Sequence, residues 1–182
     1  MKRQIMSWQT IESKHILKTS FIGVREDLRT APGFGQHSFY ILEFPDWVNV
    51  VPVTKDQQLV LVRQFRHGLA AFNLEIPGGI VDPGESPQKT VVRELVEETG
   101  YVPETVELLS KVSVNPAIQD NWCHLFLATG CQLTQEQQLD GTEDIAVELV
   151  PLAQLPQLLA QGEIHHSLNC LALSLAWSKL IQ

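Results

Sequence analysis

The sequence predicts an α/β fold in which a mixed β-sheet is sandwiched between helices. Two β-branched runs, near residues 47–54 and 59–65, are separated by the polar "KDQQ" and predict a hairpin at the start of a core sheet. Helix-capping residues bracket 87–99, and strand-like runs follow at 124–130 and 145–152. Because strands and helices alternate along the chain, we expect helices on both faces of one sheet.

The helix boundaries are indicated by local signals. Ser86 followed by Pro87 is a suitable N-cap and first-turn pair, and Gly100 ends the helix that begins there. Residues 155–161 form a short helix stopped by Gly162. Near the C-terminus, apolar side chains recur at the i, i+3, i+4, i+7 spacing of an amphipathic helix: Leu168, Leu171, Ala172 and Leu175.

The chain of 182 residues, 44% of them hydrophobic, is long enough for one ordinary domain with a small N-terminal addition. We expect an N-terminal β-region at 1–46 and a main domain at 47–182. Strand-like stretches near Ile16–Val24 and Ser38–Phe44 flank the turn-prone "APGFG" and predict a small antiparallel sheet. The apolar content of this region is too low for it to stand alone.

Charge and cysteine content exclude several classes of function. The formal net charge of −8 argues against nucleic-acid or anionic-membrane partners. No apolar run approaches the roughly 20 residues of a membrane span, and the N-terminus lacks a signal-peptide core, so we expect a cytoplasmic protein. Cys123, Cys131 and Cys170 form no C-x-x-C pair and are expected to be buried, inert thiols.

The helix at 87–99 carries an unusual concentration of acid. On a helical wheel, Glu94, Glu97 and Glu98 lie opposite an apolar side made of Val91, Val92, Leu95, Val96 and Thr99. Such like charges repel one another, but converging carboxylates also make an oxygen cage for Mg²⁺ or Mn²⁺. A solvated acidic face is the alternative interpretation.

The residues flanking this helix favour the metal interpretation. Gly78 and Gly79 follow the strand-like "LEIP", where a backbone carbonyl can approach a metal closely. Glu85 precedes the helix, and Arg93 is placed to pair with Glu97 at i+4.

These residues resemble the Nudix box, G-x5-E-x7-R-E-U-x-E-E-x-G-U, where U is a bulky apolar residue. The chain has every fixed letter, and Tyr101 stands at the final U, where an aliphatic residue is more frequent. The matching residues are Gly79, Glu85, Arg93, Glu94, Leu95, Glu97, Glu98, Gly100 and Tyr101. The resemblance implies the Nudix fold and metal-dependent hydrolysis of a nucleoside diphosphate linked to another group.

The resemblance also implies roles for individual residues. Glu94 and Glu98 look like the principal metal ligands, together with the carbonyl of Gly78. Glu97 and Glu85 would support them, each as an additional ligand or as an orienter of Arg93. Ile80 would pack near the substrate. The general base would be Glu143 in "GTEDIAV", with Glu97 as the alternative base.

The stretch before the box resembles the ADP-ribose and nucleoside-diphosphate-sugar pyrophosphatase branch of the family. Pro116, sixteen residues beyond Gly100, fits this branch, whereas "NPAIQDNWCHLFLA" lacks a glutamate that the branch often has there. Arg66 matches a phosphate-binding arginine, and Arg63 is either a second one or a partner in a surface ion pair. Asn115 and Gln119 are candidates for binding sugar hydroxyls, or form an ordinary turn.

The resemblance thus predicts Mg²⁺- or Mn²⁺-dependent hydrolysis of ADP-ribose or a related nucleoside diphosphate sugar to a nucleoside monophosphate and a sugar phosphate. A nucleotide-housecleaning or dinucleoside-polyphosphate hydrolase is the alternative enzyme, and an ADP-ribose-sensing module without activity is the alternative outside enzymes. The branch also implies a homodimer that exchanges the N-terminal sheet. Phe21, Phe39 and Tyr40 are then placed to stack on the partner's base or to fill the dimer core.

Overall fold

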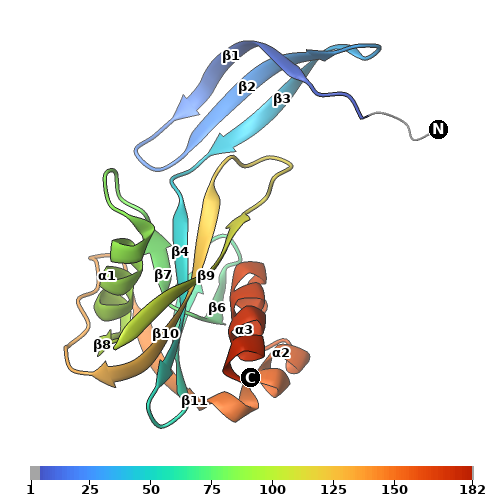
Figure 1. Cartoon of the computed structure of the whole chain (residues 1–182). Helices are drawn as coiled ribbons and strands as arrows, with labels where there is room; N and C mark the ends of the chain where they lie inside the picture. The colour runs from blue at the N-terminus through green and yellow to red at the C-terminus, as the bar shows by residue number, and fades with distance from the viewer. Residues whose placement is uncertain (1–4, 182) are drawn as a thin grey trace. The chain divides into compact units, whose positions relative to one another are not determined.

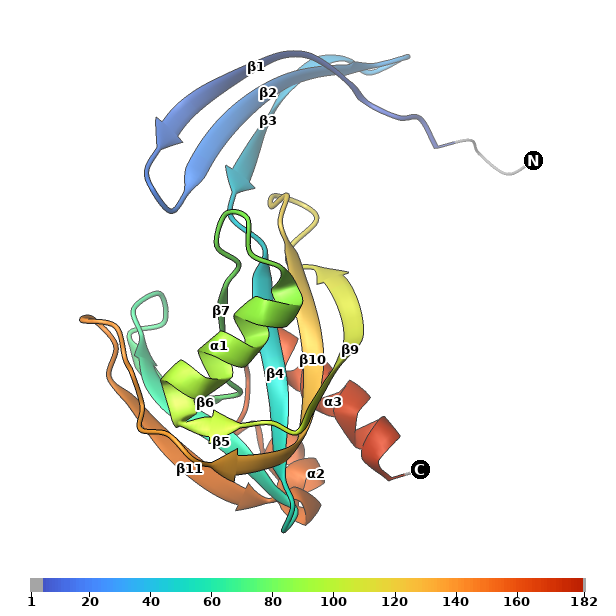
Figure 2. The same cartoon turned by 60° about the vertical axis from the view of Figure 1, so that its left-hand side comes forward.

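The computed structural model describes residues 5–181, which divide into two compact units (Figures 1 and 2). The first unit comprises residues 5–45 with Ser113–Trp122, and the second comprises Asp46–Val112 with residues 123–181. Ser113–Trp122 thus packs in the first unit, although it lies within the main domain that the sequence predicts. The functional division at residue 46 stays a prediction.

The first unit is built on a three-stranded antiparallel sheet in the order β1-β2-β3. Its strands are β1 (Gln9–Lys18), β2 (Gly23–Ala31) and β3 (Gly35–Glu43). The predicted strand Ile16–Val24 is wrong, because a turn divides it. The Thr19 hydroxyl accepts hydrogen bonds from the N–H groups of Phe21 (3.2 Å) and Ile22 (2.9 Å). This local capping competes with extended backbone.

The second unit contains an eight-stranded sheet whose central order is β11-β5-β4-β10-β8. β4 pairs with β10 in parallel and with β5 antiparallel, so the predicted mixed sheet is confirmed. β6 pairs with β5, β7 with β4 and β9 with β10. The strands are β4 (Trp47–Thr54), β5 (Gln58–Arg66), β6 (Ala71–Glu75), β7 (Gly78–Ile80), β8 (Tyr101–Val102), β9 (Thr105–Ser113), β10 (Trp122–Leu133) and β11 (Ile145–Pro151).

Helices cover both faces of this sheet. α1 (Pro87–Thr99) lies on one face and α3 (Ser167–Leu180) on the other, with η1 (Leu152–Gln154) and α2 (Leu155–Gln161) leading into α3 (Figures 1 and 2). The core beneath α1 consists of Val48, Val50, Val60, Val91, Leu95, Tyr101, Phe126, Ala128 and Cys131. Across residues 5–181, no helix has the length and apolar character needed to cross a membrane.

α1 begins and ends where the sequence predicts. The Ser86 hydroxyl accepts a hydrogen bond from the Lys89 N–H (3.4 Å), and Pro87 occupies the first turn. Gly100 adopts the left-handed conformation (φ 74°) and donates its N–H to the Val96 carbonyl (2.8 Å). These caps satisfy backbone groups that a helix end leaves free, and they fix which residues α1 presents to the sheet.

The distribution of acid on α1 differs from the prediction in one respect. Glu98 is buried with Val91 and Leu95 and does not lie on the solvated side with Glu97. The reason is helical geometry, because residues 91, 95 and 98 are spaced by four and three and therefore share one stripe. One carboxylate of the acidic helix is thus turned into the protein.

A second buried carboxylate lies in the first unit. Asp27 on β2 is 1% exposed and accepts hydrogen bonds from Arg25 (2.8 Å), Arg29 (2.6 Å) and Ser13 (2.8 Å). Burial alone would raise the pKa of Asp27, but the bonds from Arg29, Arg25 and Ser13 outweigh it and lower the pKa to about 2. The charged form of Asp27 therefore stabilises this sheet.

Replacing this carboxylate tests its contribution. Asp27→Asn is expected to lower the free energy of unfolding by about 2 kcal/mol at neutral pH, because charged hydrogen bonds are lost. The native pKa lies below the ordinary value, so the stabilisation is complete above about pH 4 and is lost as the pH falls toward about 2. Urea unfolding measures the free energy of unfolding of both proteins across this range. The difference between wild type and Asp27→Asn should become smaller as the pH falls. Glu12→Gln on β1 is the control, and a difference that did not depend on pH would contradict the assignment.

Candidate active site

The turn between β6 and β7 brings backbone against the acidic helix. β7 pairs with β4, with Gly78 opposite Asn49 and Gly79 opposite Val48. The Gly78 N–H donates a hydrogen bond to the Glu98 carboxylate (3.0 Å). A Cβ atom at Gly79 would lie 2.3 Å from the Glu94 carboxylate, so only glycine allows this approach.

Glu94 and Glu98 are two carboxylates held in a poorly solvated place. Burial raises the pKa of Glu94 to about 7, with Arg93 opposing the shift and Glu97 adding to it. Burial likewise raises the pKa of Glu98 to about 8, with the Gly78 N–H opposing the shift and Glu94 and Glu143 adding to it. Buried carboxylates with such raised pKa values are characteristic of functional sites.

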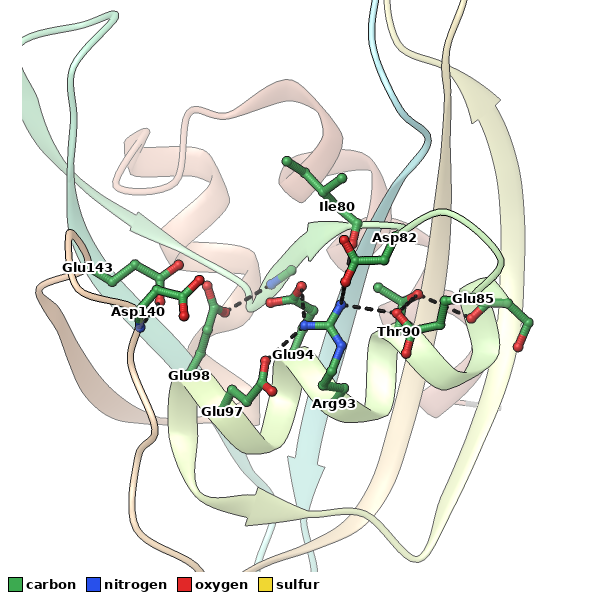
Figure 3. Close-up of polar contacts among 12 residues, drawn as sticks. Ile80, Asp82, Glu85, Thr90, Arg93, Glu94, Glu97, Glu98, Asp140 and Glu143 are labelled. Atoms are coloured by element: carbon green, nitrogen blue, oxygen red, sulfur yellow. Dashed lines mark hydrogen bonds and ion pairs between the residues drawn. The ribbon is translucent and has the colours of Figure 1, made fainter. Parts of the chain in front are cut away.

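Arg93 is the centre of a charged cluster on the exposed side of α1 (Figure 3). Its guanidinium lies 2.9 Å from Glu97, 3.0 Å from Glu94 and 3.1 Å from Glu85. Burial opposes the charge of Arg93, but these carboxylates outweigh burial and raise the pKa of Arg93. The Thr90 hydroxyl donates a second hydrogen bond to Glu85 (2.8 Å). The structure thus brings Glu85 and Glu97 together around Arg93.

The residues of this site fit a divalent cation. Within residues 5–181, no three His, Cys, Asp or Glu side chains are already arranged as the ligands of a metal ion. Glu98 bonds to the Gly78 N–H and Glu94 pairs with Arg93. However, a cation beside Glu94 and Glu98 would relieve the burial and repulsion that raise both pKa values, and carboxylate oxygens are the ligands that hard cations prefer. The use of the Gly78 carbonyl as a ligand stays a prediction.

Glu143 lies at the same site, on the segment before β11. Figure 3 shows Glu143 and Asp140 beside Glu98. The Glu143 carboxylate accepts a hydrogen bond from the Asp140 N–H (3.0 Å), and the Glu143 N–H donates to the Asp140 carbonyl (2.9 Å). A tight turn therefore holds this carboxylate near Glu94 and Glu98.

Arg66 is fixed by a residue that the sequence analysis missed. Glu75 at the end of β6 is 1% exposed, and it accepts hydrogen bonds from two nitrogens of Arg66 (2.7 and 3.0 Å). Asn73 also donates to Glu75 (3.3 Å). Burial opposes ionisation of Glu75, but the bonds from Arg66 outweigh it and lower the pKa of Glu75. The signal in the sequence is "NLEIP", which places a charged residue inside an apolar strand end.

Arg63 and Ile80 contact different parts of the second unit. Arg63 pairs with Glu148 of β11 (2.5 Å), and both side chains are partly exposed. Such a surface pair contributes little to stability and leaves no phosphate role evident for Arg63. The Ile80 carbonyl accepts a hydrogen bond from Arg93 (3.5 Å), so Ile80 lies at the edge of the charged cluster.

The remaining predicted substrate residues all lie in the first unit. Phe39 packs edge-on against Trp8 (5.1 Å between centroids), and Phe21 packs edge-on against Phe44 (5.8 Å). The Tyr40 hydroxyl donates to Glu26 (3.4 Å). The Asn115 carbonyl accepts from the N–H groups of Ile118 and Gln119, which closes a turn. These contacts all lie within the first unit, and the substrate contacts of these residues stay predictions.

Comparison with known proteins agrees with this site. The NUDIX domain model matches residues 44–169. The methanol dehydrogenase activator of Bacillus methanolicus is 30% identical over 167 residues, which cover 90% of this chain and 89% of that protein. The ADP-ribose pyrophosphatase of Bacillus subtilis (strain 168) is 32% identical over 134 residues, covering 73% of this chain and 72% of the relative.

A solved structure shows the same fold. The crystal structure of an ADP compounds hydrolase matches with a TM-score of 0.87 at 22% identity, and the match covers 99% of this chain and 97% of the other. The chain belongs to the Nudix family. With every glutamate of the box present, it is a pyrophosphohydrolase of that family.

The close approach of Gly79 to α1 can be tested directly. Gly79→Ala is expected to push the Glu94 carboxylate aside, because the new Cβ would lie 2.3 Å from it. The displaced atoms are the end of a flexible side chain, so the fold should survive while affinity for Mn²⁺ falls about 10-fold or more. Titration calorimetry measures this. Gly68→Ala, which meets no atom within 4 Å, is the control. Equal Mn²⁺ affinity in the two variants would refute the role of Gly79.

Proposed function

We propose that this enzyme hydrolyses the pyrophosphate bond of ADP-ribose or a related nucleoside diphosphate sugar, giving a nucleoside monophosphate and a sugar phosphate. The observation that carries the proposal is the buried Glu98 and the partly buried Glu94 against the Gly78–Gly79 backbone. The names of two relatives, an ADP-ribose pyrophosphatase and the ADP-sugar pyrophosphatase of Mus musculus, support this class of substrate.

The metal ion in this proposal is Mg²⁺ or Mn²⁺, held by Glu94 and Glu98 with the Gly78 carbonyl. When bound, such an ion neutralises charge on the pyrophosphate and activates or orients the attacking water. Glu85 and Glu97 hold Arg93 in place. Because they share its positive charge, the guanidinium does not fully neutralise Glu94. Each carboxylate of the box therefore has a part in presenting the metal ligands.

The residues of the chain supply proton transfer and phosphate binding. Glu143 takes a proton from the attacking water as general base, and its position beside Glu98 supports this role (Figure 3). Glu97 is the alternative base, but it is engaged by Arg93 at 2.9 Å. Arg66, held by the buried Glu75, is oriented before substrate arrives and is suited to a phosphate oxygen.

The other candidate functions are less well supported. A nucleotide-housecleaning or dinucleoside-polyphosphate hydrolase would use the same box, and only substrate choice separates it from this proposal. A non-catalytic ADP-ribose sensor, or an activator like the Bacillus methanolicus relative, does not by itself require a buried Glu98 with Glu94 beside it. The net charge of −8 supports a protein without nucleic-acid partners, and a cytoplasmic location belongs to the same proposal.

A substrate panel tests the proposed function. Purified protein is incubated with ADP-ribose, ADP-glucose, GDP-mannose and a dinucleoside tetraphosphate, with Mg²⁺ or with chelator, and products are separated by chromatography. We expect metal-dependent release of a nucleoside monophosphate from a nucleoside diphosphate sugar.

Glu98→Gln and Glu94→Gln should each lower kcat by about 10³-fold or more with the fold retained, because each removes a negative charge that binds the metal ion. Glu136→Gln is the surface control. Near-wild-type rates in either variant would exclude the metal assignment.

We further propose a homodimer that forms through the first unit. β1 is exposed at every residue and pairs only with β2 among the described strands, which leaves a long edge. Several large apolar side chains of this unit are also exposed, namely Ile11, Ile16, Leu17, Phe21 and Tyr40. A second copy of the sheet would cover both features. Base stacking by Phe21, Phe39 or Tyr40 belongs to this proposal.

Sedimentation velocity tests the assembly. The wild-type protein should sediment with about twice its chain mass of 20.4 kDa. The double variant Ile11→Glu/Leu17→Glu should sediment as a monomer, because each change places a charge on the exposed apolar surface. Lys14→Glu on the same strand is the control for altered charge. A monomeric wild-type protein would rule out the dimer.

A further inference from the structure

The segment after β10 is fastened to the end of α1 that carries Glu97 and Glu98. The last carbonyls of a helix have no partner within the helix. Here the Glu97 carbonyl accepts from the Gln138 N–H (2.9 Å), and the Gly100 carbonyl accepts from the N–H groups of Thr134 and Gln135 (both 3.2 Å). Residues 134–138 therefore act as an external cap on α1.

Within this cap, Gln137 makes its contacts through its side chain. Its Nε2 donates to the Glu98 carbonyl (2.6 Å) and to the Ile145 carbonyl (3.1 Å). Both partners are acceptors, so the amide nitrogen must face them. Ile145 is the first residue of β11 and is 5% exposed, which makes it a firm anchor.

The two hydrogen bonds of Gln137 enclose the segment that carries Glu143. The last residue of the segment that is bonded to α1 is Gln138, and the chain enters the sheet again at Ile145. The side-chain amide of Gln137 bonds to α1 at Glu98 and to the sheet at Ile145. Between them, the Asp140–Glu143 turn presents the Glu143 carboxylate beside Glu98 (Figure 3). We call the two hydrogen bonds from Gln137 to the Glu98 and Ile145 carbonyls the Gln137 clamp. The distance between Glu143 and α1 therefore depends on this clamp.

We propose that Gln137 is a positioning residue that fixes the position of the Glu143 carboxylate beside Glu98 of α1. This inference rests on the proposed function, in which Glu143 is the general base. Gln137 itself does not touch the reacting atoms. Its effect on turnover passes through Glu143, because small misplacements of a catalytic group lower rates strongly.

Gln137→Met tests the clamp, since methionine keeps the length of the side chain and removes both donors. We expect kcat to fall about 10-fold with little change in KM. Gln138→Met is the matched control, because Gln138 bonds to the Glu97 carbonyl through its backbone N–H, which survives the change. Equal kcat values in Gln137→Met and Gln138→Met would overturn the proposal.

A double-mutant cycle shows whether the effect passes through Glu143. Glu143→Gln alone should lower kcat by roughly 10²-fold, as expected for loss of a general base. Adding Gln137→Met should then lower kcat no further, because coupled residues are not additive. A full additional 10-fold loss in the double variant, or an unchanged kcat in Glu143→Gln, would refute action through Glu143.

Hydrogen exchange separates this proposal from the function on which it rests. Amides of residues 139–144 should exchange faster in Gln137→Met than in Gln138→Met without any substrate present. Equal exchange rates would show that no clamp exists, whatever the activity. A wild-type protein inactive on every nucleoside diphosphate sugar would instead refute the proposed function, and the exchange rates would still decide the clamp.

Discussion

A carboxylate on the buried side of an amphipathic helix must be compensated, and in the second unit this requirement is set by Glu98. The Gly78 N–H supplies one compensating hydrogen bond, which is possible only because β7 runs beside β4. That pairing in turn requires glycine at 78, since a Cβ there would lie 2.3 Å from the Val48 carbonyl. The burial of Glu98 thus accounts for the short strand, for Gly78 and for the close contact between helix and turn, while Gly79 makes room for Glu94.

The compensation of Glu98 is incomplete, and this makes the site reactive toward cations. One N–H is a weak counterpart for a buried negative charge, and Glu94 and Glu143 add repulsion. Arg93 does not relieve this repulsion alone, because it is divided among Glu85, Glu94 and Glu97. Arg66 also attracts Glu98, but its guanidinium is bonded to Glu75, so neither arginine neutralises Glu98 and the site stays suited to a bound cation.

Features determined by neighbouring residues were predictable from the sequence, whereas features determined by distant contacts were not. The limits of α1 follow from Ser86 and Gly100, which act within a few residues of themselves. The box also identified Arg93 and its carboxylates by spacing alone. By contrast, the partner of Arg66 is Glu75 on the adjacent strand, and their side chains meet only because β6 folds back against β5. The turn at Thr19 was missed because Ile16–Val24 has a strand-like composition, which a single hydroxyl overrides.

The way the segment before β11 is fastened has a consequence for how this region can change in length. The anchors at Thr134, Gln135 and Gln138 use backbone groups, so their side chains are free to vary. Residues 139–144 lie between the fixed points, where insertions or deletions would leave the anchors in register. One extra residue between Gln135 and Gln137 would shift the Gln137 and Gln138 anchors relative to those at Thr134 and Gln135, and the cap could no longer form as a whole. A change of length that keeps this cap on the helix is therefore confined to six consecutive positions, and there it would move Glu143.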